Sequence, residues 1–132
     1  MAPSPTASVS PGAVAAATPA PAVPAVADER ERRVEASGPD ATVAFTNRGA
    51  RLLSWQLPKF LDARGKPEEM VPATREGVRP LEIETGRPEV DARLREALFR
   101  PSAERLDLGS QGGEVRFDYA SGDLQATKVI HM

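Results

Sequence analysis

The chain has 132 residues, of which 17 are basic and 19 acidic, so its formal net charge at neutral pH is −2. It contains no cysteine and a single histidine, His131. These numbers exclude a disulfide framework, a thiolate zinc site, a cysteine nucleophile and a catalytic triad built on histidine. The balanced charge also provides no field that would attract nucleic acid, and we expect no nucleic-acid partner.

The first 27 residues are rich in alanine and proline and carry no charge. Proline lacks the backbone donor that a helix needs, and the small side chains offer too little apolar area to offset the entropy of ordering. Residues 1–30 are therefore predicted to be a disordered linker, and residues 31–132 to form one folded part.

The same region lacks the features of a membrane or export segment. Its most apolar run, residues 12–27, is interrupted by prolines and is shorter than the roughly 20 residues of a transmembrane helix. A signal peptide begins with a basic region, whereas no lysine or arginine precedes Arg30. We therefore expect no membrane segment in this chain.

Alternation of apolar and polar side chains predicts short strands in the first half of the folded part. Val43 and Phe45 share one face of a strand, and Leu53, Trp55 and Leu57 share one face of the next. These two strands are predicted to form a hairpin. The strands predicted in this half are residues 34–36, 41–46, 51–57 and 69–72.

Turn residues separate these strands. Gly49 suits the turn at residues 47–50, because glycine adopts a positive φ without steric cost. Pro58 is expected to end the second strand of the hairpin, and residues 62–67 are expected to form another turn. A polar loop at residues 73–80 then leads to a further short strand, residues 81–85.

The apolar period changes after residue 88. Val90, Leu94 and Leu98 recur at the spacing of one helix face, with Pro88 suited to the first turn and Pro101 expected to stop the helix. Three acid-before-base pairs at a spacing of four residues support this helix; they are Glu89 with Arg93, Asp91 with Arg95 and Glu96 with Arg100.

The last part of the chain returns to strand periodicity. Residues 105–108 are expected to be extended, and residues 114–119 alternate, with Val115, Phe117 and Tyr119 on one face. A turn at residues 120–123 leads to a last strand, residues 124–130. The predicted fold is mainly β, built from antiparallel hairpins with one short helix. The side chains expected to face a common interior are Phe45, Leu53, Trp55, Leu57, Val115, Phe117 and Tyr119.

Several groups of residues could carry chemistry, but each has a simpler structural interpretation. The glycine-rich residues 109–113 lack the Gly-Lys-Ser/Thr ending of a phosphate loop and lead into a strand. Paired carboxylates can serve acid–base catalysis of glycoside hydrolysis, but a solvated surface is expected here for Glu82, Glu84, Glu68 and Glu69. Trp55 with Phe45 is expected to be core, and Arg48 with Arg51 a small basic spot. The sequence therefore predicts no catalytic, cofactor-binding or metal-binding residue, and no enzyme.

One longer pattern is more specific. Residues 42–72 contain the turn Asn47-Arg48-Gly49-Ala50, the strand residues Leu53-Ser54-Trp55, and then Lys59-Phe60-Leu61-Asp62 before Val71-Pro72. In this order they resemble the opening of the large periplasmic domain of YidC-type bacterial membrane protein insertases. Residues 99–130 are also similar to this domain, and the stretch rich in alanine and proline is similar to the family's variable linker.

The resemblance implies a fold, a location and a role. It implies that the chain is the N-terminal portion of a larger β-supersandwich similar to galactose mutarotase, truncated near Ile130. The implied location is the periplasmic side of the bacterial inner membrane. There the domain would support insertion and folding of membrane proteins by contacts with Sec translocon-associated membrane proteins and nascent membrane proteins, without catalysis or cofactor. Strand 124–130 would then present an open edge that favours self-association.

Two other interpretations remain open from the sequence. The chain could be a carbohydrate-binding or mutarotase-like β-sandwich module of the cell envelope. It could also be a free-standing envelope binding module with an alanine- and proline-rich tether.

Overall fold

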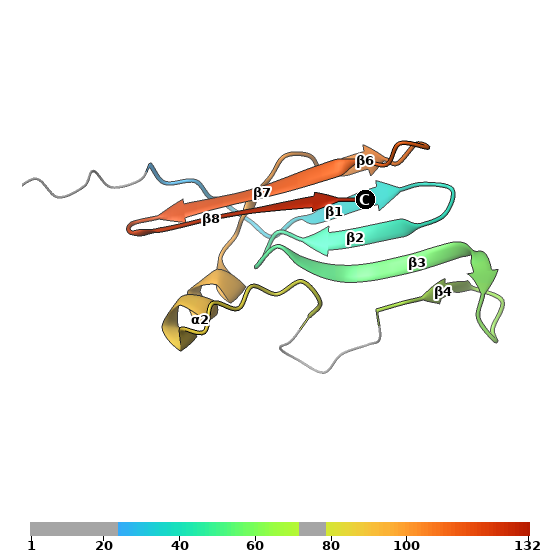
Figure 1. The fold of residues 1–132 in the computed structure, drawn as a ribbon, viewed down its shortest axis with the longest axis horizontal. Helices are drawn as coiled ribbons and strands as arrows, with labels where there is room; N and C mark the ends of the chain where they lie inside the picture. The colour runs from blue at the N-terminus through green and yellow to red at the C-terminus, as the bar shows by residue number, and fades with distance from the viewer. Residues whose placement is uncertain (1–23, 72–78) are drawn as a thin grey trace, which may run out of the picture.

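Two β-sheets packed face to face form the body of the computed structural model, which describes residues 24–71 and 79–132 (Figure 1). The larger sheet has five strands in the order β4-β3-β2-β1-β6, and the smaller has three in the order β5-β7-β8. The described residues are thus mainly β, as the sequence predicts. The elements are β1 Arg33–Ser37, β2 Thr42–Thr46, β3 Arg51–Leu61, β4 Pro67–Glu69, α2 Pro88–Glu96, β5 Arg100–Pro101, β6 Arg105–Asp107, β7 Glu114–Ser121 and β8 Leu124–His131.

Antiparallel hairpins build most of both sheets. The β2–β3 and β7–β8 hairpins lie where the sequence predicts them, and the predicted extended segment after the helix is β6, which pairs in parallel with β1. The β7–β8 hairpin closes through a two-residue loop whose first residue, Gly122, has φ +60°. A positive φ at that position is typical of hairpin turns that match the twist of the strands.

A β-bulge at Leu53 changes which side chains of β3 face the core. Val43 pairs with Trp55 and Phe45 pairs with Leu52, so Leu53 is the extra residue on β3. An inserted residue shifts the alternation by one position, so Leu52 shares the face of Trp55. Leu52 is therefore buried, whereas Leu53 is half-buried and outside the core cluster. The prediction that Leu53 faces the core is wrong, because simple alternation cannot reveal an inserted residue.

The core lies between the two sheets. Phe45 of β2 and Phe117 of β7 are fully buried, and their rings meet edge to face with centroids 6.0 Å apart. Val115 is also fully buried, so these three core predictions are confirmed. Trp55 and Tyr119 are only half-buried but pack against the core.

The remaining predicted core residue, Leu57, is half-buried and does not pack against the core cluster. Phe99 is fully buried although it follows the helix. Sequence periodicity does not identify it as a core residue.

The bounds of β3 and β4 differ from the sequence predictions. Strand β3 continues through Pro58 to Leu61, because its pairing with β2 ends at Gln56 and its pairing with β4 skips residues 58–60. Proline is tolerated where its missing donor is not needed by the ladder. Strand β4 is an edge strand as predicted, but it begins at Pro67, two residues earlier.

The predicted strand at residues 81–85 is absent from the described structure, and the helix is shorter than predicted. Leu81 has φ +67°, which is incompatible with a strand. Helix α2 ends at Glu96 because Ala97 is extended. The carbonyl of Ala97 then accepts a hydrogen bond from Gly49 N at 2.8 Å, and Phe99 N donates to Asn47 O at 2.9 Å. Tertiary hydrogen bonds thus replace the last helical turn.

The predicted end of the linker, at residue 30, lies too late in the sequence. Residues 1–23 and 72–78 lie outside the described residues. The predictions of a disordered linker and of a polar loop therefore fall mostly outside the described structure. Val26, however, exchanges two backbone hydrogen bonds with Ala120, at 2.9 and 2.8 Å, and Asp28 N donates to Leu98 O at 2.9 Å. The residues from Val26 onward therefore belong to the folded part.

Candidate functional site

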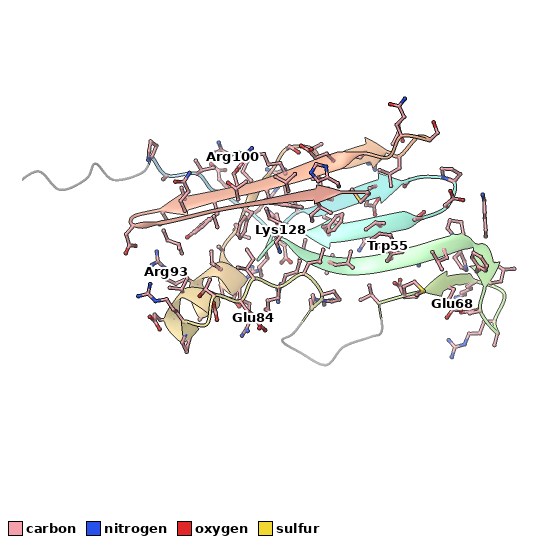
Figure 2. The ribbon with its side chains drawn as sticks, viewed as in Figure 1. Trp55, Glu68, Glu84, Arg93, Arg100 and Lys128 are labelled. Atoms are coloured by element: carbon pink, nitrogen blue, oxygen red, sulfur yellow. The ribbon has the colours of Figure 1, made fainter. Side chains whose placement is uncertain are left out.

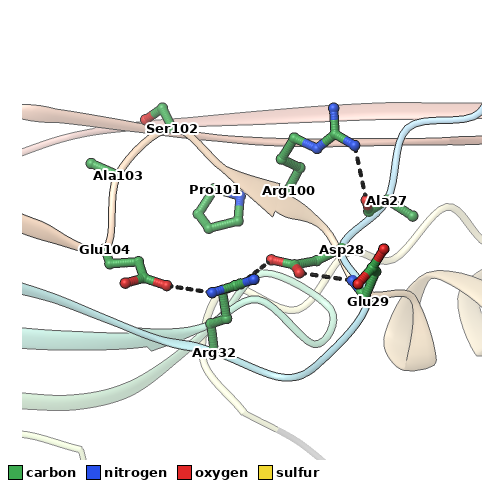
Figure 3. A pocket seen from close by; sticks show the side chains of 9 residues that line it. All are labelled: Ala27, Asp28, Glu29, Arg32, Arg100, Pro101, Ser102, Ala103 and Glu104. Atoms are coloured by element: carbon green, nitrogen blue, oxygen red, sulfur yellow. Dashed lines mark hydrogen bonds and ion pairs between the residues drawn. The ribbon is translucent and has the colours of Figure 1, made fainter.

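Two hollows lie at opposite ends of strand β1. One, of about 470 Å³, is next to its first residue and contains mainly charged side chains (Figure 3). The other, of about 360 Å³, is next to its last residue and contains Trp55. We call them the Arg32 hollow and the Trp55 groove. The Arg32 hollow is lined by Ala27, Asp28, Glu29, Arg32, Arg100, Pro101, Ser102, Ala103 and Glu104.

Three of the charged side chains of the Arg32 hollow are paired, because Arg32 bridges two carboxylates. Arg32 donates from Nε to Asp28 Oδ2 at 2.5 Å and from Nη1 to Glu104 Oε1 at 2.7 Å, and Arg100 donates to Ala27 O at 3.2 Å (Figure 3). The hydrogen bond from Arg32 holds the pKa of Asp28 below its ordinary value. A carboxylate that is ionised and paired at neutral pH is a poor general acid. The arrangement therefore favours a structural role.

Asn47 holds this end of the molecule together. Its side chain is fully buried and donates from Nδ2 to Phe99 O and to Arg30 O, both at 3.0 Å. Its Oδ1 accepts a hydrogen bond from Arg32 N at 2.6 Å. One amide thus joins the β2–β3 turn, the chain after α2 and the segment before β1. The sequence indicates only a turn residue here, because an Asn near a glycine is typical of any turn.

Lys128 of β8 is a half-buried polar group that lies between the sheets on the side of the helix (Figure 2). Its Nζ donates to Ala50 O at 2.8 Å and to Leu81 O. Burial lowers the pKa of Lys128 to about 8, a shift that the charge of Glu82 opposes and that of Arg51 enhances. The ammonium thereby connects the smaller sheet to the turn before β3 and to the segment before α2.

Glu82 is buried beside this lysine. Only 5% of its side chain is exposed, and its Oε1 lies 2.6 Å from Arg95 Nε and 3.5 Å from Arg51 Nη1. Its Oε2 has no hydrogen-bond partner among the described residues. The expectation of a solvated surface is therefore wrong for Glu82, although Glu84 is exposed. The partners of Glu82 are distant in sequence, so no local pattern could reveal the burial.

The other candidates from the sequence are structural or solvent-exposed. Arg48 pairs with Glu96 at 2.9 Å and with Glu31 at 3.3 Å, and Arg51 is buried, so the two do not form an exposed basic spot.

Glu68 is exposed on β4, as expected. Its neighbour Glu69 accepts hydrogen bonds from Ser54 Oγ at 2.5 Å, Trp55 N at 2.8 Å and Val71 N at 3.0 Å. Partial burial raises the pKa of Glu69, but these hydrogen bonds outweigh it, and the net shift is downward.

The glycine-rich residues 109–113 form a closed loop rather than a phosphate cradle. Gly112 N donates to Gly109 O at 3.0 Å, and Gly113 exchanges two hydrogen bonds with Met132, at 3.0 and 2.9 Å. The loop leads into β7, whereas anion sites of this type open a helix. The sequence favours a hairpin loop here, but the loop joins β6 and β7, which lie in different sheets and do not pair. It forms one wall of the Trp55 groove.

The Trp55 groove differs from the Arg32 hollow in chemistry. Apolar side chains of the larger sheet, of the loop before β7 and of Met132 meet in it with a few polar groups, and Figure 2 shows where Trp55 lies on β3. A volume of roughly 300–1,000 Å³ with apolar walls and few polar groups is typical of ligand sites. Its lining residues are Gly38, Pro39, Asp40, Ala41, Val43, Trp55, Leu108, Gly109, Ser110, Gln111, Gly112 and Met132.

The β3–β4 hairpin presents further apolar side chains beyond the groove. Phe60 and Leu61 are each 65% exposed, and Met70 is 57% exposed. The hairpin is connected to the β1–β2 turn by an ion pair between Lys59 Nζ and Asp40 Oδ1 at 2.6 Å. Together the groove and this hairpin form the candidate site, a surface suited to binding rather than to catalysis.

No family model and no curated protein matches the sequence. Among residues 24–71 and 79–132 no cluster of His, Cys, Asp and Glu could hold a metal ion. In the same part of the chain, no helix has the length and apolar character to span a membrane.

Proposed function

We propose that this chain is a non-catalytic binding part of a YidC-type membrane protein insertase, which acts on the periplasmic side of the inner membrane. In this role it contacts Sec translocon-associated membrane proteins and nascent membrane proteins. The resemblance of residues 42–72 and 99–130 supports the family, and the galactose mutarotase-like supersandwich is part of the same proposal.

The observation that carries the binding role is the exposure of Phe60 and Leu61 on a hairpin anchored by the Lys59–Asp40 ion pair. Large apolar side chains grouped on a surface are typical of protein–protein contacts. The charged clusters elsewhere, around Arg32 and Glu82, are largely paired within the chain and stabilise the fold.

Site-specific photocrosslinking tests this proposal with defined components. A photoreactive phenylalanine analogue at Phe60 is incubated with the purified Sec translocon and, separately, with a ribosome-bound nascent inner-membrane protein. The same analogue at Glu89, an exposed residue of α2, is the control. We expect crosslinks from position 60 and none from position 89. Equal crosslinking at both positions, or none at either, would refute the proposal.

A specific observation favours a second function, carbohydrate binding. Trp55 is the only tryptophan and lies in a groove that also contains Asp40, Ser110 and Gln111. Aromatic faces with neighbouring hydrogen-bonding groups suit the apolar and polar parts of a sugar. Because tryptophan emission reports only on this groove, titration with soluble envelope sugars distinguishes the two functions. A saturable emission change without any crosslink from Phe60 would favour the carbohydrate module.

A further inference from the structure

Strand β8 has one hydrogen-bonded edge and one open edge. The paired hydrogen bonds between Gly113 and Met132 fix the alternation of the antiparallel β7–β8 ladder. In such a ladder every second residue bonds to the neighbouring strand. Ala126, Lys128 and Ile130 therefore bond to β7, as Met132 bonds to Gly113. The residues between them direct their N–H and C=O groups away from β7, and none of these groups pairs with a described residue. They are Gln125, Thr127, Val129 and His131, and their side chains are exposed.

The outer edges at β7 and at β4 are occupied or protected. The far edge of β7 is covered by Val26, by β5 and by Ser102, whose N donates to Arg116 O at 2.8 Å. Strand β4 has three residues, one proline and two glutamates, which are features that prevent pairing at an edge.

Strand β8 lacks these features. Its eight residues pair with β7 without a bulge, it contains no proline, and its lysine points inward to Ala50 O. It is therefore suited to accept another strand.

The position of β8 over the larger sheet indicates which kind of strand fits. The side chain of Lys128 reaches Ala50 O beside the start of β3, and Met132, directly after β8, lines the Trp55 groove with Val43 of β2 and Trp55 of β3. The larger sheet continues one strand further, to β4. If the β8 strands of two copies paired antiparallel, the larger sheets of both copies would lie on the same face of the joined smaller sheets. The β3 and β4 strands of one copy would then occupy the same space as those of the other. A single extended segment does not create this clash.

We propose that the open edge of β8 binds an extended segment of another protein as an additional antiparallel strand. This mode of recognition obtains affinity from main-chain hydrogen bonds and specificity from alternate side chains. The segment carries apolar side chains at every second residue, on the side that faces β3 and β4, and polar side chains between them. The proposal goes beyond the proposed function and rests on the geometry of β8.

A proline substitution provides a direct test on the full chain. The N–H of Val129 points to the open edge, so Val129→Pro removes no bond of the β7–β8 ladder, whereas it blocks an added strand. Val129→Thr keeps the N–H and is the matched control. The probe is a synthetic peptide of alternating valine and threonine, as long as the 8 residues of β8 and flanked by lysines.

Binding and amide hydrogen exchange are measured together. We expect the peptide to protect the amides of Thr127 and Val129 in the unsubstituted chain, while those of Ala126 and Lys128 are protected with or without it. We expect Val129→Pro to bind about tenfold more weakly, which corresponds to the loss of one backbone hydrogen bond. The Val129→Thr variant should bind as the unsubstituted chain does.

A second peptide comparison does not depend on the folding of the proline variant. N-methylation of the threonines removes the donors that face β8 and should abolish binding, whereas N-methylation of the valines should not. Absence of binding by the unmodified peptide, or equal binding of both methylated forms, would overturn the proposal. A dimer of the unsubstituted chain in sedimentation that Val129→Pro dissociates would instead identify a second copy as the occupant, and would also overturn it.

Discussion

At one end of the sandwich, Asn47 is fully buried and its amide joins three segments of the chain. At the other end, Trp55 is half-buried and two neighbouring apolar side chains, Phe60 and Leu61, are 65% exposed. A buried polar group is stable only when its hydrogen bonds are made, so the first end is fixed by the chain itself. The second end leaves apolar area uncovered, which a binding partner could remove from water.

This contrast explains where function is to be sought. The Arg32 hollow is the larger of the two, but Arg32, Asp28 and Glu104 in it are paired with one another. The Trp55 groove is smaller, and its apolar walls remain available for a partner. Size alone would select the wrong end, whereas the state of the polar and apolar groups selects the Trp55 end.

The largest expected effect is at Asn47. Replacing Asn47 by Ala leaves the carbonyls of Arg30 and Phe99 without their donor, and the N–H of Arg32 without its acceptor. At roughly 1 kcal/mol for each net hydrogen bond, the free energy of unfolding should fall by about 3 kcal/mol. Urea denaturation measures this loss.

The variant Asn47→Asp is the matched control for this prediction. It keeps the acceptor for Arg32 N but loses the donors to both carbonyls, and we expect it to be no more stable than Asn47→Ala. A stability of either variant equal to that of the unsubstituted chain would show that Asn47 does not hold this end together.

A smaller effect is expected at Trp55. Replacing a buried aromatic residue by alanine costs roughly 3–5 kcal/mol, so a half-buried one should cost about 1–2 kcal/mol. Acrylamide quenching of the tryptophan emission should be intermediate between that of a buried and that of a free tryptophan. If Trp55→Ala destabilised the fold more than Asn47→Ala does, the contrast between the two ends would be wrong.

The sequence predicts most strands but not the groups that distinguish the two ends. Alternation identifies β2, β7 and β8 because each keeps one face toward the core over its whole length. It fails in β3, where the bulge at Leu53 moves Leu52 into the core. It also fails for Asn47 and Glu82, since their partners lie in distant segments of the chain. Tertiary hydrogen bonds and ion pairs leave no periodic signal.

The next prediction concerns Lys128, whose ammonium donates to Ala50 O near the end that contains Asn47. Its folded pKa of about 8 lies below the ordinary value of 10.5, because burial disfavours the charged form. Between these two pH values the unfolded chain binds more protons than the folded one, so the free energy of unfolding should rise with pH. Screening by solvent limits this rise to about 1 kcal/mol.

Urea denaturation at pH 8 and pH 10.5 measures the rise, and Lys128→Met should remove it. The conservative variant Lys128→Arg, which does not titrate in this range, should remove it as well. An equal rise in all three chains would assign the pH dependence to other groups.

The smallest effect on the free energy of unfolding is expected at Phe60. Stability and binding can be measured separately at this residue. An exposed side chain contributes little to folding, so Phe60→Ser should change the free energy of unfolding by no more than about 0.5 kcal/mol. The same substitution should lower the yield of the proposed translocon crosslink when the photoreactive group is moved to the neighbouring Leu61, because the apolar contact is reduced. Arg93→Ser, at another exposed position, on α2, should leave that yield unchanged. A loss of stability at Phe60 comparable to that at Trp55 would mean that the hairpin is part of the core, whereas a lost crosslink with unchanged stability assigns this surface to binding.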